Sequence, residues 1–181
     1  MATPDLRIEA LDADGARREQ ASLATLLRNV VDDGGSVGFL PPLSEEDARE
    51  YWEGAADAVK GGARLLWVAR DAGAIVGPII GTVQLDLEKR ANGNHRAELI
   101  KLMVHPSARR RGVGRALMLA AQDEARRRGR QTLVLDTRRG DPSEALYRAL
   151  GWTCAGVIPR YARSANGELH ATALYYLLLD G

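Results

Sequence analysis

The chain has too few of the residues that mark disulfide-rich or metal-binding proteins. Cys154 is its single cysteine among 181 residues, so no internal disulfide can form. That cysteine lies in a strand-like run, where a buried and unreactive thiol is expected. The three histidines and one cysteine do not have zinc-ligand spacing, which predicts that no metal is needed.

Long hydrophobic runs are also missing. No apolar segment approaches the length needed to cross a bilayer. Residues 1–5 do not begin a basic region followed by an apolar one, as a secretory signal would. The sequence therefore predicts a soluble, cytoplasmic protein without a membrane partner.

No charge of one sign dominates the chain, whose formal net charge is +1. The basic run at residues 126–130 has no aromatic residues among its charges and falls in the last turn of an expected helix. A solvated helix end is favoured there over a nucleic-acid patch. With 45% hydrophobic residues and no repeat, low-complexity tract or linker, residues 1–181 are predicted to form one domain.

Both common phosphate-binding motifs are absent, yet one glycine-containing turn remains. There is no G-x-x-x-x-G-K-[ST] loop and no G-x-G-x-x-G after a first strand. Instead, the basic segment 109–114, with glycines at Gly112 and Gly114, joins an apolar run to a long amphipathic one. The free N–H groups of a helix start bind anions, so this turn predicts a phosphate-bearing cofactor. The alternative is a solvated basic loop.

Periodicity and turn residues predict alternating strands and helices, and therefore a mixed α/β domain. Pro78 interrupts one apolar run, so a bulge or an edge position is expected there. Asn166 and Gly167 form a strong hairpin signal between the last two strands. The expected strands are 6–11, 65–70, 75–87, 98–104 and 133–137, and the expected helices are 14–31 capped by Asp14, a helix from Ser44 to about Lys60, 114–128 and 143–150.

The order of these motifs resembles the GNAT family of acetyl-coenzyme A-dependent N-acetyltransferases. The resemblance rests on R-x-x-G-x-G, the strand at 132–136 and the A-L-Y-R-A-L-G-W box at 145–152, and it covers roughly residues 64–179. It implies an acyltransferase with a mostly antiparallel central sheet flanked by about four helices. Acetyl-coenzyme A is the implied co-substrate.

The same resemblance implies which residues hold the cofactor. The loop should bind the pyrophosphate through backbone amides, and the preceding strand should pair with the pantetheine and polarise the acetyl carbonyl. The residues concerned are Leu102, Met103, Val104, Arg109, Arg110, Arg111, Gly112, Val113, Gly114 and Arg115. One departure is Gly140, which stands where many members have an asparagine that contacts the pantetheine.

A narrower resemblance concerns the acceptor. Segments 34–39, 92–98 and 167–173 are similar to those of family members that acetylate a β-lactam toxin. This implies transfer to a primary amine of a small molecule, with antibiotic or toxin resistance as the role. A peptide or protein N-acetyltransferase and a non-catalytic acyl-coenzyme A-binding regulator remain as alternatives, and a homodimer is left open.

Glu98 is the first candidate base. Strand alternation would place it with Ile100, Leu102 and Val104 on a largely apolar face, where partial desolvation raises a carboxylate's pKa. The alternative is a strand-end glutamate in water, or one paired with Arg96 or Lys101. The resemblance implies a base at this position.

Asp136 is the second candidate, because it ends an apolar strand where ligands of open α/β sheets bind. Its alternative role is to cap the next turn. The resemblance implies that Tyr147 is the acid that protonates the departing thiolate. The alternative is a tyrosine that only packs against its neighbours. Ser36, Phe39 and His170 are weaker candidates for contact with the acceptor.

Overall fold

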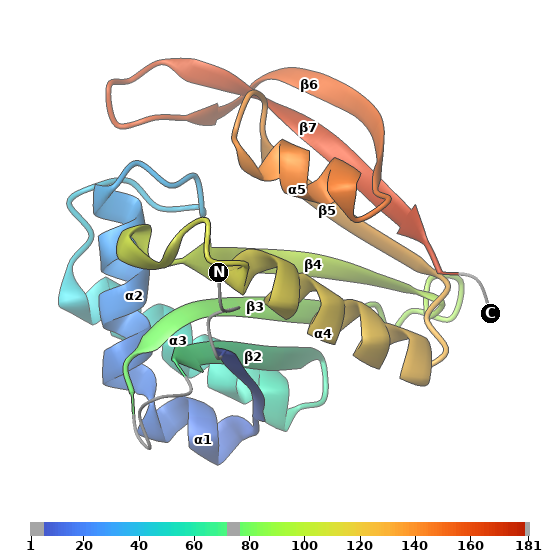
Figure 1. The fold of residues 1–181 in the computed structure, drawn as a ribbon, viewed down its shortest axis with the longest axis horizontal. Helices are drawn as coiled ribbons and strands as arrows, with labels where there is room; N and C mark the ends of the chain where they lie inside the picture. Colours follow the sequence, from blue (N-terminus) through green and yellow to red (C-terminus); the bar gives the residue numbers. More distant parts are fainter. Residues whose placement is uncertain (1–5, 72–76, 180–181) are drawn as a thin grey trace.

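A mixed sheet of seven strands organises the computed structural model, which describes residues 6–71 and 77–179 (Figure 1). The strand order is β1-β2-β3-β4-β5-β7-β6, and only β4 and β5 run parallel. The strands are β1 (Leu6–Leu11), β2 (Arg64–Asp71), β3 (Ile79–Leu87), β4 (Arg96–Val104), β5 (Thr132–Arg138), β6 (Thr153–Arg163) and β7 (Leu169–Leu178). The expected mixed, mostly antiparallel sheet is confirmed.

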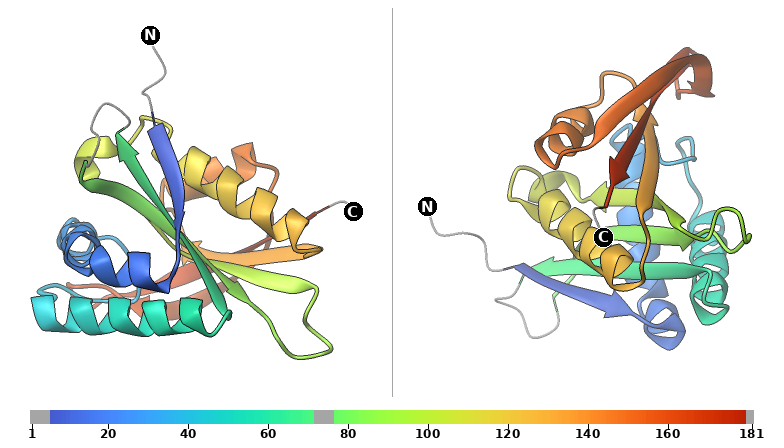
Figure 2. Two further views of the ribbon diagram at one scale, coloured as in Figure 1. Left: turned by 90° about the horizontal axis from the view of Figure 1, so that it is seen from below. Right: turned by 90° about the vertical axis from the view of Figure 1, so that its right-hand side faces the viewer.

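Helices cover both faces of this sheet. Figure 2 shows α4 on one face and α1 to α3 on the other, with α5 beside β5 and the β6–β7 hairpin. The helices are α1 (Ala13–Arg18), α2 (Gln20–Asp32), α3 (Glu45–Lys60), α4 (Val113–Arg127) and α5 (Ser143–Ala149), with a short 3-10 turn, η1 (Pro106–Ala108), before α4. No helix of the described part has the length and hydrophobicity needed to cross a bilayer.

The first helix begins earlier than predicted and is divided. Asp12, and not Asp14, is its N-cap, because the Asp12 carboxylate accepts a hydrogen bond from the Gly15 amide at 2.7 Å. The chain leaves α1 at Glu19 and starts α2 at once. Ser44 caps α3 as expected, accepting from the Asp47 amide at 3.0 Å.

The apolar run around Pro78 gives a shorter strand than predicted. Positions 75 and 76 of that run lie outside the described residues, and β3 begins only at Ile79. The register between β2 and β3 shifts between Ala69 and Arg70, directly opposite the start of β3. The irregularity expected near Pro78 is therefore present, because proline cannot donate to a strand ladder.

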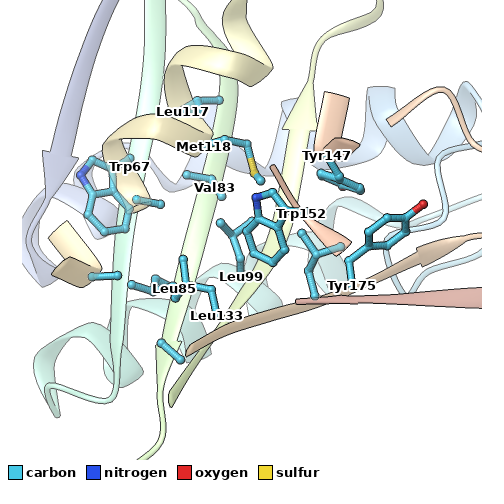
Figure 3. Packing of buried hydrophobic residues seen from close by; sticks show 14 of the residues in the cluster. Trp67, Val83, Leu85, Leu99, Leu117, Met118, Leu133, Tyr147, Trp152 and Tyr175 are labelled. Atoms are coloured by element: carbon cyan, nitrogen blue, oxygen red, sulfur yellow. The ribbon is translucent and has the colours of Figure 1, made fainter. Parts of the chain in front are cut away.

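Two apolar cores lie on opposite faces of the sheet. Figure 3 shows part of the core beneath α4, where Leu117 and Met118 meet side chains from β3, β4 and β5. The second core joins α2 and α3 to the other face and contains the fully buried Trp52. Each fully buried large apolar side chain contributes about 1.5–3 kcal/mol, so both cores fix the sheet between the helical layers.

Strand β4 departs from simple alternation. Its register with β3 shifts between the pairs Thr82–Met103 and Gln84–Ile100, and Lys101 has a φ of 50°. Leu99, Leu102 and Val104 therefore all pack on the α4 side, whereas Met103 belongs to the core beneath α2 and α3. The predicted face shared by Glu98, Leu102 and Val104 is wrong, because the bulge reverses the alternation after residue 100.

Strands β4 and β5 stay paired for only a short distance. Arg96, Ala97 and Glu98 face Thr132, Leu133 and Val134, and no further pair follows although both strands continue. Figure 1 shows the two strands diverging from this point. Beyond Glu98, the backbone of β4 is consequently bonded to β3 on one edge and to no described strand on the other.

The C-terminal hairpin turns at Asn166 and Gly167 as predicted, and Gly167 has a φ of 85°. Cys154 lies on its outer strand β6 and is exposed, so the expected burial of the thiol is wrong. An edge strand lacks a neighbour to cover its side chains. The basic run at the end of α4 is neutralised locally: Arg126 pairs with Asp123, and Arg127 pairs with Glu124.

Candidate active site

The loop before α4 forms a concave run of backbone amides. Arg110 and Gly112 both have left-handed backbone conformations, with φ values of 61° and 81°. Gly112 is the N-cap residue of α4, no side chain caps that end, and its first turn has no acidic residue. The free N–H groups and the helix dipole therefore favour an anion at this position.

The side chains of this loop are largely engaged elsewhere. Arg109 forms an ion pair with Asp33 at 2.5 Å, and Arg111 pairs with Asp71. Arg110 and Arg115 are exposed, and Val113 is buried in the core beneath α4. This loop thus presents backbone amides to an anion, together with the exposed side chains of Arg110 and Arg115.

Gly81 is a residue that the sequence interpretation missed. A Cβ placed there would lie 2.8 Å from Val113 Cγ1 and 3.0 Å from the Met103 carbonyl oxygen. Only glycine allows the start of α4 to approach β3 and β4 this closely. A glycine inside a strand was the available signal.

The free edge of β4 lies next to this helix start. Leu102 and Val104 are half-buried against the α4 core, and Met103 is buried on the other face, so their side chains are committed to packing. Their backbone N–H and C=O groups on the β5 side remain without a strand partner among the described residues. An extended ligand with amide groups fits such an edge.

Glu98 and Asp136 come together at the point where β4 and β5 separate. Desolvation by the surrounding protein raises the pKa of Glu98, and repulsion from Asp136 and then Asp86 raises it further. The raised pKa has the expected direction, although Glu98 retains an exposed surface. A carboxylate with a raised pKa is a stronger base toward an ammonium group.

Asp136 does not cap a turn. It lies two residues before the end of β5, and the Thr172 hydroxyl donates to it at 2.9 Å. Its charge acts on the pKa values of Glu98, Lys101 and Tyr147, which places it centrally among the candidate residues. This second carboxylate can hold a positive group near Glu98.

Tyr147 is buried, with 5% of its surface exposed, so its hydroxyl does not simply point into solvent. Its ring centroid lies 6.3 Å from that of Trp152 and 5.6 Å from that of Tyr175. The three side chains are labelled in Figure 3. Burial raises its pKa to about 12, although a hydrogen bond with Ser143 acts to lower the pKa. The phenol therefore stays protonated at neutral pH and acts as a hydrogen-bond donor.

Lys101 is the second residue that the sequence interpretation missed as a site residue. The bulge directs its side chain toward α3, where its Nζ lies 5.3 Å from the ring centroid of Tyr51 and 5.8 Å from that of Phe39. Nearby, Arg64 makes a two-pronged contact with Asp86, at 2.5 Å and 2.9 Å. A positive φ at a lysine is not readable from the sequence.

The weaker candidates separate in space. Phe39 packs edge-on against Tyr51 on the same face as Lys101. Ser36 is exposed in the same α2–α3 connection, and His170 lies beside Arg138, whose Nη2 is 2.7 Å from His170 Nε2. His105 caps η1 through Ser107 and is structural.

A cavity of about 300 Å³ borders Glu98 and Asp86. Its lining is polar and apolar in similar measure, and the charged residues Arg64 and Arg96 also contribute to it. A small polar acceptor fits this volume. Within residues 6–71 and 77–179, no group of three His, Cys, Asp or Glu side chains is arranged to hold a metal ion.

Comparison with known proteins links this geometry to a family. A family model described as Acetyltransferase (GNAT) matches residues 31–152. An N-acetyltransferase from the hisH–hisA intergenic region of Azospirillum brasilense is 35% identical over 120 residues, which cover 64% of this chain and 67% of that protein. The ribosomal protein bS18-alanine N-acetyltransferase of Escherichia coli K12 is 36% identical over 73 residues, covering 40% of this chain and 49% of that enzyme.

A solved structure shows the same fold. A Salmonella typhimurium protein, determined with acetyl-coenzyme A as its cofactor, superposes with a TM-score of 0.77 at 18% identity. The superposition covers 97% of this chain and 95% of that one. The backbone arrangement is therefore shared over nearly the whole length.

Proposed function

The chain belongs to the GNAT family and is an acetyl-coenzyme A-dependent N-acetyltransferase, and from this premise we propose that its acceptor is the primary amine of a small molecule. The observation that carries the proposal is that Glu98, on whose pKa the charge of Asp136 acts, lines a cavity of about 300 Å³. A cavity of this size suits a small molecule, whereas a peptide needs an extended groove.

The free edge of β4 and the start of α4 fit the co-substrate. The backbone groups of Leu102 to Val104 that face away from β3 would bind the pantetheine amides, and the loop from Arg109 to Arg115 would bind the pyrophosphate. Acetyl-coenzyme A supplies the thioester whose acetyl group is transferred. The rigid β4 edge holds the reacting carbonyl in place and polarises it.

Glu98 and Asp136 are proposed to prepare the amine. A free primary amine has a pKa near that of lysine, about 10.4, so it arrives mostly protonated at neutral pH. Two carboxylates attract that ammonium, and Glu98, with its raised pKa, accepts the proton. The neutral amine can then attack the carbonyl.

Tyr147 is proposed to act on the other reactant. Its phenol remains protonated because burial raises its pKa to about 12. It donates a hydrogen bond, and then a proton, to the sulfur as the thiolate leaves. The aromatic contacts with Trp152 and Tyr175 hold its ring in position.

The narrower resemblance suggests the kind of acceptor. Segments 34–39, 92–98 and 167–173 are similar to those of the tabtoxin resistance protein, which acetylates a β-lactam amino acid. The first of these segments contains Phe39, and the second ends at Glu98. Both residues border the side of the sheet that α3 covers, which we call the acceptor face. An amino-acid-like toxin is therefore the proposed acceptor, and resistance in the cytoplasm the proposed role.

The direct test is an acceptor screen. Purified protein is incubated with acetyl-coenzyme A and a panel of primary amines, amino acids and short peptides, and thiol release is measured. We expect at least one small amine to be acetylated faster than every peptide. Better use of peptides would reject the small-molecule assignment, and an absence of turnover with every acceptor would favour the regulator.

A protein acceptor is the second candidate, because the bS18-alanine enzyme of E. coli is 36% identical over 73 residues. The matched stretch covers 49% of that enzyme. Peptides with an N-terminal alanine therefore belong in the screen. Their acetylation at a rate above that of all small amines would establish this alternative.

A further inference from the structure

Lys101 occupies an unusual position on the acceptor face. It has a φ of 50° at the bulge of β4, a conformation that is uncommon for a residue with a side chain. Such a conformation is strained, and strain of this kind is concentrated at functional sites. The bulge brings the lysine onto the same side of the sheet as Met103 and the α3 core.

The lysine ammonium is enclosed by protein on that side. Its Nζ lies beside the rings of Phe39 and Tyr51, which are themselves in contact, and a Cβ built on Gly38 would approach it to 3.3 Å. The side chain is half-buried, and desolvation lowers its pKa. Keeping a cation in such surroundings is unfavourable unless an anion compensates it.

No described carboxylate compensates it by direct contact. The neighbouring cation, Arg64, is already paired with Asp86 through two contacts. Among residues 6–71 and 77–179, Lys101 has no ion-pair contact, although the charges of Asp136, Asp86 and Glu98 lie near enough to oppose the lowering of its pKa by desolvation. Lys101 is therefore a cation of this face that remains available to a ligand.

We propose that Lys101 binds a carboxylate of the acceptor, so that the acceptor is a zwitterion whose amine faces Glu98 and Asp136. The inference rests on the proposed function and specifies its substrate class. Opposite charges on one small molecule then match opposite charges on one face of the protein. Phe39 and Tyr51 keep the ammonium in place by cation–π contact while the ligand is absent.

Paired probes test this directly. The standard L-amino acids and their α-carboxamides are compared as acceptors with the wild-type enzyme, Lys101→Met and Lys101→Arg. Wild-type kcat/KM is expected to favour the acid of the best pair, and Lys101→Met to reduce that preference by about tenfold to a hundredfold, the loss of one charge-assisted contact. The acid-to-carboxamide ratio of kcat/KM is compared between the enzymes, which cancels the difference in amine basicity between acid and carboxamide.

Lys101→Arg separates recognition from packing. Arginine keeps the charge and the cation–π contact, so the preference for the acid should be retained in large part. An equal loss of activity on both members of each pair in Lys101→Met would overturn the inference and leave Lys101 as a packing residue. A wild-type enzyme that uses carboxamides as well as acids would overturn it as well.

Binding provides a readout that does not need turnover. Calorimetric titration of the same acids and carboxamides into the protein saturated with coenzyme A should show acid binding that weakens in Lys101→Met. If this dependence is seen while no amine is acetylated, the proposed function fails and the carboxylate site stands. If amines are acetylated without this dependence, the proposed function stands and the carboxylate site fails.

Discussion

On the face of the sheet covered by α4, the candidate cofactor site consists of backbone: a free β4 edge, a glycine N-cap and unsatisfied helix amides. On the face covered by α3, the candidate acceptor site consists of side chains, with Glu98, Asp136 and Lys101 as its charged groups. Backbone groups do not depend on side-chain identity, whereas the charged side chains of the acceptor site do. Substitutions should therefore have separable effects on the two faces.

The largest effect is expected on the acceptor face. Glu98→Gln and Asp136→Asn keep shape but remove negative charge, so each should lower turnover by about a hundredfold to ten-thousandfold, the range for acid–base groups. The double variant should lose less than the product of the single losses if the two carboxylates share one proton path. Steady-state rates with the best acceptor measure this, and acetyl-coenzyme A affinity should not change.

Asp123→Asn, an exposed change on α4 that removes only the contact with Arg126, is the matched control. Wild-type rates in both Glu98→Gln and Asp136→Asn would contradict the paired-carboxylate proposal.

The pH profile sharpens the same comparison. Desolvation, Asp136 and Asp86 raise the pKa of Glu98, whereas Arg96 and Lys101 lower it. Activity should therefore fall on the acid side at a pH above the usual glutamate value of about 4.3. Asp136→Asn removes a negative charge and should move this limb of kcat/KM to lower pH, while Lys101→Met should move it to higher pH.

Only the remaining activity of each variant needs to be measured as a function of pH. If the acid limb stays at the same pH in both variants, it does not arise from the titration of Glu98.

On the cofactor face, Gly112→Asp should weaken acetyl-coenzyme A binding by about a hundredfold, because a carboxylate at a helix start repels phosphate and loses the close backbone approach. Gly129→Asp is the matched control: both glycines have positive φ, 81° and 68°, and a Cβ meets nothing within 4 Å at either. They lie at opposite ends of α4. Calorimetric titration should show normal affinity in the control.

Equal losses of affinity in Gly112→Asp and Gly129→Asp would show that the effect comes from backbone strain and not from repulsion of the phosphate. Gly114→Asp should weaken binding too, but less cleanly, since a Cβ there lies 3.3 Å from Leu146 Cδ2.

Tyr147→Phe should have a smaller effect than the carboxylate substitutions. It should lower turnover by about tenfold to a thousandfold and leave cofactor affinity unchanged. The pKa of Tyr147 is about 12, so its loss of a proton should not limit wild-type activity below that pH. Tyr175→Phe is the control, because its hydroxyl bonds Glu144 at 2.5 Å in the same aromatic cluster. Full activity of Tyr147→Phe across the pH range would leave Tyr147 as a packing residue.

The smallest effect is expected for Arg109→Ala, about 1 kcal/mol of acetyl-coenzyme A binding, as for an exposed charge contact. Arg109 already pairs with Asp33 at 2.5 Å, so the phosphate competes for it. Asp33→Ala should then leave affinity unchanged or raise it slightly. A loss from Arg109→Ala as large as that from Gly112→Asp would reverse the assignment of the site to backbone.

Sequence by itself determined the fold class and most element positions, and it singled out the candidate phosphate loop, because these depend on local patterns. Alternation marks strands, Ser44 marks a helix start, Asn166 and Gly167 mark a hairpin, and glycines beside a helix mark an anion loop. Each signal lies within a few residues of what it predicts. The family followed from the order of these local motifs.

Tertiary structure decided the acceptor face, because that face joins residues that are distant along the chain. The bulge at Lys101 depends on the register of β4 against β3, and it reversed the expected face of Glu98 relative to Leu102 and Val104. Asp136 influences Glu98 only because β4 and β5 pair for three residues and then separate. Strand register and separation arise from long-range packing, which no local pattern encodes.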